Sequence, residues 1–235
     1  MTTKTIPKVT LECIEIPPEG TVSGSIIWLH GLGASGHDFA PVVPHLGLPN
    51  IRFVFPHAPN LPVTINGGMV MPAWYDLRSL SPSPDRESEK DIGDSSLLVQ
   101  ELIDREVARG VPPNRIILAG FSQGAGMALH VGLRQEQPLA GLMILSGYLV
   151  LPEKAPQEWA DSSRRTPVYF SHGTRDGVVR HQRGREAFEV LESHGYDVSW
   201  SDYPMMHEVC AEQIRDISEW LQGLFSAQPN ERANS

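Results

Sequence analysis

The sequence is poor in cysteine and in continuous apolar runs. Its 235 residues include only two cysteines, Cys13 and Cys210, which lie near opposite ends of the chain. This excludes a dense disulfide framework and a zinc site built from paired cysteines. No stretch approaches the roughly 18 apolar residues of a membrane span, and residues 1–10 lack the apolar centre of a signal peptide. We therefore expect reduced thiols and a soluble, cytoplasmic protein.

Positive charge is also scarce. Lys and Arg total 19 against 28 Asp and Glu, which gives a net charge of -9. A surface that attracts phosphate backbones or anionic membranes needs clustered Lys and Arg. We therefore expect neither a nucleic-acid partner nor integral membrane association. The 9 histidines show no metal-ligand spacing, so no metal site is expected.

Short apolar runs bounded by Gly, Pro or Asn alternate with helical patterns. Val99, Ile103 and Val107 recur with helical spacing after Asp94, and Gly110 marks the end of that helix. A last helix has an apolar face made of Ile214, Ile217, Leu221 and Leu224. The runs predict buried strands at 25–30, 51–56, 115–120, 139–145, 167–171 and 198–203. This alternation predicts an α/β fold, a mostly parallel central sheet with helices on both faces, in a single domain spanning 1–235.

Two segments do not fit this alternation. Residues 58–91 show no sustained period, and a loop of that length is usually functional or disordered. Because Asn66-Gly67 is flanked by apolar residues, we predict a small hairpin in an ordered excursion beside the active site. The charges of 82–91 are predicted to form a solvated rim, and the polar tail 228–235 is expected to fray.

The motif that indicates chemistry is Gly120-Phe121-Ser122-Gln123-Gly124, which joins a predicted buried strand to a helix of small residues. This is the pattern of a nucleophile elbow, in which a strained turn raises a serine hydroxyl above the sheet. The glycines are needed because a side chain at either position would collide with the neighbouring strand and helix. Ser122 is therefore the candidate nucleophile.

A serine nucleophile needs a histidine to accept its proton and a carboxylate to orient that histidine. In this fold the order along the chain is Ser, Asp, His. Asp176 follows a strand that ends in a glycine turn, and His207 lies between the last strand and the last helix. They are the candidate acid and base, with Asp202 as an alternative acid. His30 and His172 are expected to brace loops.

The oxyanion of an acyl-transfer intermediate needs backbone donors. One is expected from the amide of Gln123, directly after the nucleophile, and the other from the loop at 28–33, where glycines let the main chain approach the substrate. The amide of Leu32 is the candidate there.

The chain resembles the phospholipase/carboxylesterase family, which includes acyl-protein thioesterases and bacterial carboxylesterases with the α/β-hydrolase fold. The resemblance spans nearly the whole chain and rests on the segments 29–33, 36–39, 56–59, 66–68, 71–76, 120–124, 145–147, 172–176 and 203–207. It implies that Ser122, Asp176 and His207 form a triad and that the amides of Leu32 and Gln123 bind the oxyanion. It also implies hydrolysis of carboxylic esters or acyl thioesters without a cofactor, and the substrates of some members are lysophospholipids or S-acylated proteins.

In this family the excursion lines the acyl channel, which implies that Met71 and Trp74 contact substrate. The run Trp74-Tyr75-Asp76 is equally compatible with packing that anchors the excursion. The family usually has a glycine before the base histidine, where this chain has Met206. We expect Met206 either to narrow the acyl site or to shift the loop of His207, which predicts weaker acceptance of long acyl chains and a preference for short to medium ones. Relatives often form homodimers, and apolar residues around the excursion are candidates for such a contact.

Two other functions remain open on the sequence alone. A protein of this fold can bind a hydrophobic ligand without turnover, since fold does not dictate function. The same serine can also transfer an acyl group to an alcohol or amine instead of water, as an acyltransferase does.

Overall fold

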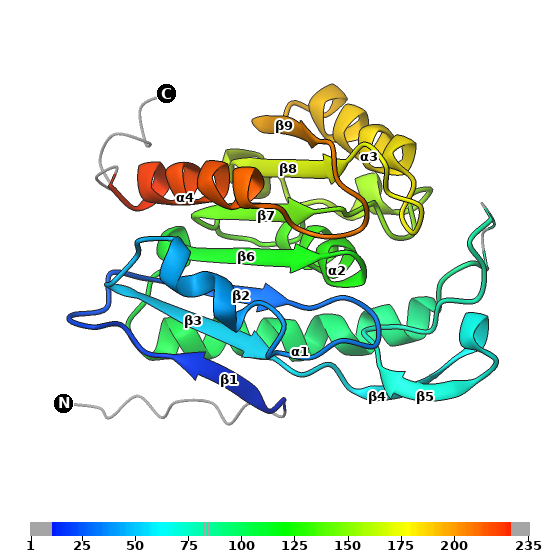
Figure 1. The fold of residues 1–235 in the computed structure, drawn as a ribbon, viewed down its shortest axis with the longest axis horizontal. Coiled ribbons are helices and arrows are strands. Elements are labelled where there is room, and N and C mark those ends of the chain that lie inside the picture. The colour runs from blue at the N-terminus through cyan, green and yellow to red at the C-terminus, as the bar shows by residue number, and fades with distance from the viewer. Residues whose placement is uncertain (1–10, 82, 84, 227–235) are drawn as a thin grey trace.

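The computed structural model describes residues 11–81, 83 and 85–226. Its centre is a seven-stranded sheet in the order β1-β3-β2-β6-β7-β8-β9 (Figure 1). All neighbouring strands are parallel except β1, which runs antiparallel to β3. The strands are β1 Cys13–Ile16, β2 Gly24–Leu29, β3 Ile51–Pro56, β6 Ile116–Phe121, β7 Gly141–Leu145, β8 Val168–Gly173 and β9 Val198–Tyr203. The predicted mostly parallel sheet is confirmed.

Helices cover both faces of this sheet, as predicted. Helices α1 Glu89–Ala108, α2 Gln123–Gly132 and α3 His181–Ser193 pack on one face, while α4 Ala211–Ser226 and the short 3-10 helix η1 Ala40–His45 pack on the other (Figure 1). Successive strand residues point to opposite faces. In β2, Ile27 and Leu29 enter the core under α1 and α2, whereas Ile26 and Trp28 enter the core under α4. No helix among the described residues is long and apolar enough to cross a bilayer.

Helix α1 begins earlier than its apolar pattern predicts. Ser88 is its N-cap, and the Ser88 side chain accepts a hydrogen bond from the amide of Asp91 at 3.3 Å. The first turn consists of polar residues, so the spacing of apolar residues does not predict it. The helix ends as expected near Gly110, whose φ of 94° is a left-handed conformation that favours glycine.

The excursion between β3 and α1 is ordered at the residues described. Strands β4 Asn60–Val63 and β5 Met69–Pro72 form the predicted hairpin, with Asn60 opposite Pro72. Its turn contains the short 3-10 helix Thr64–Asn66 followed by two glycines with positive φ. The Asp76 carboxylate ties the hairpin to the following chain, because it accepts bonds from the amide and hydroxyl of Thr64 at 2.7 and 2.8 Å.

The prediction of a solvated rim at 82–91 is wrong for its central residues. Arg86 is 7% exposed and Glu87 is 5% exposed. An isolated antiparallel bridge pairs Glu87 with Leu77, and the amide of Leu151 donates to the Glu87 carboxylate at 3.1 Å. These backbone contacts draw the charged residues inward, and a local sequence pattern does not contain them. Residues 82, 84 and the tail 228–235 lie outside the described residues.

Candidate active site

Ser122 lies where β6 ends and α2 begins. Its backbone has φ 55° and ψ -119°, an unusual conformation for a residue with a side chain. The residue is 8% exposed and lines a cavity of about 480 Å³. The strained turn thus presents a hydroxyl to an opening at the carboxyl end of the parallel strands, where ligands bind in open α/β sheets.

The two glycines of the motif are sterically required. A Cβ atom at Gly120 would lie 2.2 Å from the carbonyl oxygen of Gly124. A Cβ atom at Gly124 would lie 2.4 Å from the carbonyl oxygen of Leu29 in β2 and 2.5 Å from that of His30. Since these neighbours are backbone atoms, they cannot move aside cheaply. The elbow therefore packs against its own helix and the adjacent strand, as expected from the sequence.

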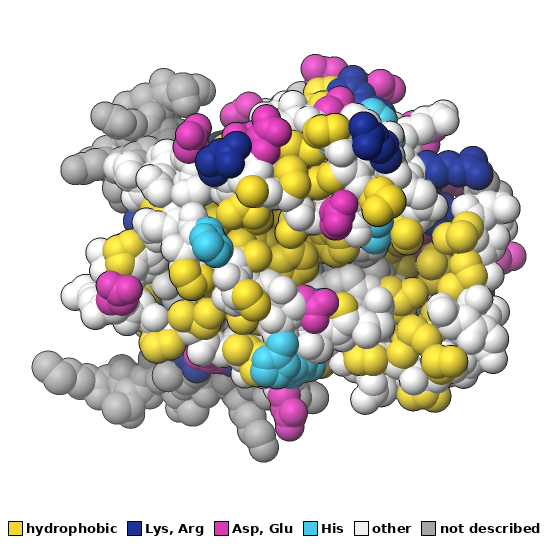
Figure 2. All heavy atoms as spheres, in the orientation of Figure 1, with side chains coloured by type: hydrophobic (Ala, Val, Ile, Leu, Met, Phe, Trp, Pro, Cys, Tyr) yellow, Lys and Arg dark blue, Asp and Glu magenta, His cyan; other side chains and the backbone are white. Residues whose placement is uncertain are grey.

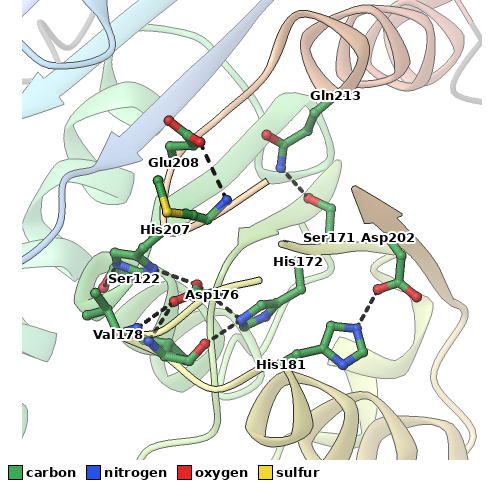
Figure 3. A network of polar contacts seen from close by, with 12 residues as sticks. Ser122, Ser171, His172, Asp176, Val178, His181, Asp202, His207, Glu208 and Gln213 are labelled. Carbon is green, nitrogen blue, oxygen red and sulfur yellow. Dashed lines mark hydrogen bonds and ion pairs between the residues drawn. The ribbon is translucent and has the colours of Figure 1, made fainter. Parts of the chain in front are cut away.

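The structure brings Ser122, His207 and Asp176 together in a chain of hydrogen bonds (Figure 3). Nε2 of His207 lies 2.9 Å from the Ser122 hydroxyl, and Nδ1 of His207 lies 2.7 Å from Oδ2 of Asp176. Asp176 comes from the turn after β8 and His207 from the segment between β9 and α4. This arrangement lets an imidazole accept the serine proton while a carboxylate fixes its tautomer.

Asp176 is held by three hydrogen-bond donors, with a fourth and weaker contact from His172. The amides of Val178 and Val179 donate to its Oδ1 at 2.8 and 2.9 Å, while His207 and Nε2 of His172, at 3.3 Å, approach its Oδ2. Burial by itself would raise the pKa of Asp176, but the hydrogen bonds from His172 and His207 lower it well below its usual range. The carboxylate is therefore ionised and oriented. His172 also donates to the carbonyl of Val179 at 2.8 Å, which fits a bracing role.

The alternative acid, Asp202, lies elsewhere. Its Oδ1 contacts Nε2 of His181 at 2.6 Å, at the start of α3 (Figure 3). Asp202 is therefore engaged with a different histidine from the one that contacts Ser122.

The loop after β2 brings a backbone amide to the same cavity. Leu32 lines the cavity with Ser122 and Gln123. Within the described residues, the amides of Leu32 and Gln123 have no hydrogen-bond acceptor from the protein. The loop is held in place because the amide of Gly33 donates to the Pro72 carbonyl at 2.8 Å. Both amides are thus free to receive an oxyanion.

His30 braces this loop, as expected. Its Nδ1 donates to the carbonyl of Gly31 at 2.7 Å, and its Nε2 accepts from the amide of Ala58 at 3.0 Å. Burial lowers the pKa of His30, which favours the neutral tautomer that these two bonds require. Trp74 adds a further tie, since its indole nitrogen donates to the His30 carbonyl at 2.9 Å.

The side chain of Gln123 has a role that the sequence analysis missed. Its Oε1 accepts from the amide of Trp74 and its Nε2 donates to the carbonyl of Tyr75, both at 2.8 Å. The residue is 2% exposed. The excursion is therefore bonded to the residue that follows the nucleophile. A glutamine beside an elbow serine gives no sequence signal of this distant contact.

Gln123→Ala is expected to destabilise the protein by about 2 to 4 kcal/mol, because two buried backbone groups lose their partners. Urea denaturation followed by circular dichroism measures this. The control is Gln137→Ala, since Gln137 is exposed. Equal denaturation midpoints for the two variants would show that Gln123 does not anchor the excursion.

The cavity at Ser122 has a largely apolar lining. It is formed by Gly31, Leu32, Ala34, Asp38, Phe39, Leu77, Leu80, Arg86, Phe121, Ser122, Gln123, Tyr148, Val178, Val179, His207, Glu208 and Val209. Figure 2 shows the molecule from the same side as Figure 1. Hydrophobic side chains surround a hollow in the middle of the face in view and also cover the β4–β5 hairpin. An apolar cavity with a few polar groups is typical of a small-molecule site.

The three residues that were predicted to contact substrate do not line this cavity. Trp74 is fully buried where the excursion packs on the rest of the protein, which favours the packing interpretation of Trp74-Tyr75-Asp76. Met71 packs in a small cluster with Leu32. Met206 is 61% exposed, so the expectation that it narrows the acyl site is not supported. The reason is that the backbone carbonyls of Met205 and Met206 lie against Gly173, which leaves the Met206 side chain outside.

Comparison with known proteins agrees with this geometry. Residues 12–225 match the phospholipase/carboxylesterase family. The chain belongs to this family. Among its similar relatives is acyl-protein thioesterase 1 of Cryptococcus neoformans, which is 36% identical and aligns over 90% of this chain and 97% of its own. Acyl-protein thioesterase 1 of Neurospora crassa is 35% identical, with 88% and 89% of the two chains aligned.

Solved structures of the phospholipase/carboxylesterase family and its relatives share the fold. SOBER1 of Arabidopsis thaliana has a TM-score of 0.80 at 30% identity, covering 86% of this chain and 98% of its own. Acyl-protein thioesterase 2 of Zea mays has a TM-score of 0.79 at 25% identity, covering 91% and 99%. The chain is thus a serine hydrolase of the α/β-hydrolase fold, and we do not retain the alternative of a ligand-binding protein without turnover.

Proposed function

We propose that Ser122 is the nucleophile of an ester and thioester hydrolase, with His207 as its base and Asp176 as the acid that orients His207. The observation that supports this most directly is the continuous hydrogen-bond chain of 2.9 and 2.7 Å that starts at a strained serine in an apolar cavity. No cofactor enters this proposal.

In the first half of the reaction, the Ser122 oxygen attacks the acyl carbonyl carbon while Nε2 of His207 takes the hydroxyl proton. The carbonyl oxygen becomes an oxyanion, to which the amides of Leu32 and Gln123 donate. Each such donor contributes about 3 to 4 kcal/mol in related chemistry. The intermediate collapses when the bond to the alcohol or thiol breaks, and His207 gives its proton to that leaving group.

In the second half, water takes the place of the leaving group. His207 removes a proton from the water as it attacks the acyl-enzyme, and the same two amides receive the second oxyanion. When the Ser122–acyl bond breaks, His207 returns the proton to Ser122. The carboxylic acid leaves, and Asp176 remains ionised throughout, in keeping with its lowered pKa.

As substrates we propose carboxylic esters and thioesters, including those of lysophospholipids or S-acylated proteins. The apolar cavity favours an acyl chain over a polar acid. The relatives named acyl-protein thioesterase favour a thiol leaving group. A site in the cytoplasm is consistent with two cysteines that are both free thiols.

The test is to label the purified protein with a fluorophosphonate probe and to identify the modified peptide by mass spectrometry. We expect a single adduct, on Ser122. Turnover is then compared for oxygen esters and thioesters of increasing acyl length. An unlabelled, folded protein, or an adduct on a different serine, would disprove the assignment of the nucleophile.

Acyl transfer to another acceptor is the second candidate, because the same acyl-enzyme can react with an alcohol or amine. The products are compared with and without a competing alcohol. A hydrolase gives mainly free acid at low alcohol concentration, whereas a transferase gives ester exchange.

A homodimer is a further proposal. Ile65, Met69 and Val70 are exposed apolar side chains on the β4–β5 hairpin. Size-exclusion chromatography with light scattering tests it: a mass of about 26 kDa, that of the chain, would contradict it.

A further inference from the structure

The cavity at Ser122 is adjacent to a second and larger one of about 1000 Å³, between the excursion and α3. Both cavities are lined by Leu80, Arg86, Tyr148 and Val178. These four residues therefore form a shared wall, and a group bound at that wall is accessible from the catalytic cavity.

A cluster with excess positive charge lies at this wall, with Arg86 buried and Arg183 partly exposed. The guanidinium groups of Arg86 and Arg183 lie 5.4 and 4.1 Å from the centre of the Tyr148 ring. Their only acidic contact among the described residues is Glu87. Its Oε1 lies 3.3 Å from Nε of Arg86 and 3.8 Å from a terminal nitrogen of Arg183. Two cations thus share one carboxylate.

The arginines are short of hydrogen-bond acceptors. Each guanidinium carries several N–H donors in a fork that matches a carboxylate. Yet Nε of Arg86 is buried without a hydrogen bond, and within the described residues neither side chain donates one to the protein. The other Glu87 oxygen is occupied by the amide of Leu151. One of these donors, Nε of Arg86, is fully buried and lies against Glu87, and the terminal nitrogens of both arginines have no acceptor from the described residues, so an incoming anion could accept from them.

Arg86 is placed to contact the acyl part of the substrate and not the leaving group. His207 protonates the leaving group, so the leaving group must lie beside His207. The next residue, Glu208, lines the same cavity, and so does Asp38 from the loop after β2. These carboxylates disfavour an anionic leaving group. Among the described residues that line the catalytic cavity, Arg86 is the only Lys or Arg.

Burial and the charge of Arg86 lower the pKa of Arg183, in keeping with two cations that lie against the same tyrosine ring. An anion between them would relieve the repulsion of these cations. A neutral acyl chain would leave it in place.

We infer that Arg86 and Arg183 bind a carboxylate at the far end of the acyl chain, so that the enzyme accepts half-esters and half-thioesters of dicarboxylic acids. The inference rests on the proposed function and adds a substrate class to it. The apolar lining holds the chain, the Arg86 wall holds its terminal carboxylate, and Ser122 attacks the carbonyl at the other end.

The experiment compares three esters. Two are para-nitrophenyl esters, the monoester of adipic acid and the ester of hexanoic acid, and the third is the hexanoate ester of para-hydroxybenzoate. The last carries its anion on the leaving group. We expect Arg86→Gln to lower the ratio of kcat/KM for adipate over hexanoate by about 10- to 100-fold, the usual effect of a charge-assisted hydrogen bond. Arg183→Gln should lower it less, and Arg86→Lys should keep part of it.

The control is Arg185→Gln, a neighbouring arginine of α3 that stacks on Trp200 and Phe188 outside both cavities, and its ratio should match wild type. An unchanged ratio in Arg86→Gln and Arg183→Gln overturns the inference. So does an equal loss with both esters, which indicates a structural role, or a loss confined to the para-hydroxybenzoate ester. If wild type hydrolyses none of the three, it is the proposed function that fails.

Discussion

Ser122→Ala is expected to lower kcat for hydrolysis of para-nitrophenyl butyrate by about 10⁶-fold, with little change in folding. The reason is that the acyl-enzyme cannot form without the hydroxyl that lies 2.9 Å from His207. Loss of the nucleophile costs about this much in other serine hydrolases, where the residual rate comes from the oxyanion donors and binding. The rate of para-nitrophenol release by a thoroughly purified variant measures the effect.

The matched control for this variant is Ser193→Ala, at the exposed end of α3. It removes the same atoms far from the cavity and should keep full activity and full labelling by the fluorophosphonate. If Ser122→Ala folded and turned over at a rate close to wild type, Ser122 would not be the nucleophile.

Asp176→Asn is expected to lower kcat by about 10⁴-fold, through the tautomer of His207. The wild-type Oδ2 receives the Nδ1–H of His207, and Nε2 of His172 lies 3.3 Å from it. In the variant, Oδ1 keeps the amides of Val178 and Val179, so the new NH₂ group faces these two imidazoles. His207 must then present an unprotonated Nδ1 to it. That leaves Nε2 protonated toward Ser122, which loses its base.

The matched control is Asp202→Asn, because Asp202 makes the same kind of contact with His181 away from Ser122. It should keep kcat near the wild-type value. Fluorophosphonate labelling of Asp176→Asn should slow in proportion to kcat, since both reactions need the activated hydroxyl. A small loss in Asp176→Asn, or a loss of similar size in Asp202→Asn, would contradict the assignment of the acid.

The sequence predicted strands well where they are mostly apolar and buried, as in β3, and also where apolar and polar residues alternate, as at the start of β9. Strands β3 and β9 begin and end at the predicted residues. Strand β1 was missed because it has only four residues, lies at the edge of the sheet and contains no fully buried residue. The place of β1 in the sheet is set by its pairing with β3, from Ile16 opposite Phe53 to Cys13 opposite Pro56, and no local pattern contains a contact so distant in the chain.

The candidate site was accessible to sequence analysis because its residues sit at element ends. Ser122 is bracketed by glycines that only a tight approach explains, and Asp176 and His207 follow strands at the same edge of the sheet. The contacts of Gln123 and the burial of Arg86 were not accessible. Both depend on how the excursion folds back over the elbow. A sequence does not show whether a polar residue is exposed to water or forms hydrogen bonds inside the protein.

The hydrogen bonds of the excursion constrain how substrate reaches the serine. The excursion holds the loop of Leu32 through Pro72 and Trp74, and it holds the elbow through the Gln123 side chain. If the excursion swung away like a lid, the two amides that we propose to bind the oxyanion would lose this support at the moment of opening. The site could then be open to substrate or correctly arranged for catalysis, but not both at once. Substrate and product must therefore exchange through an entrance that stays open throughout the turnover cycle.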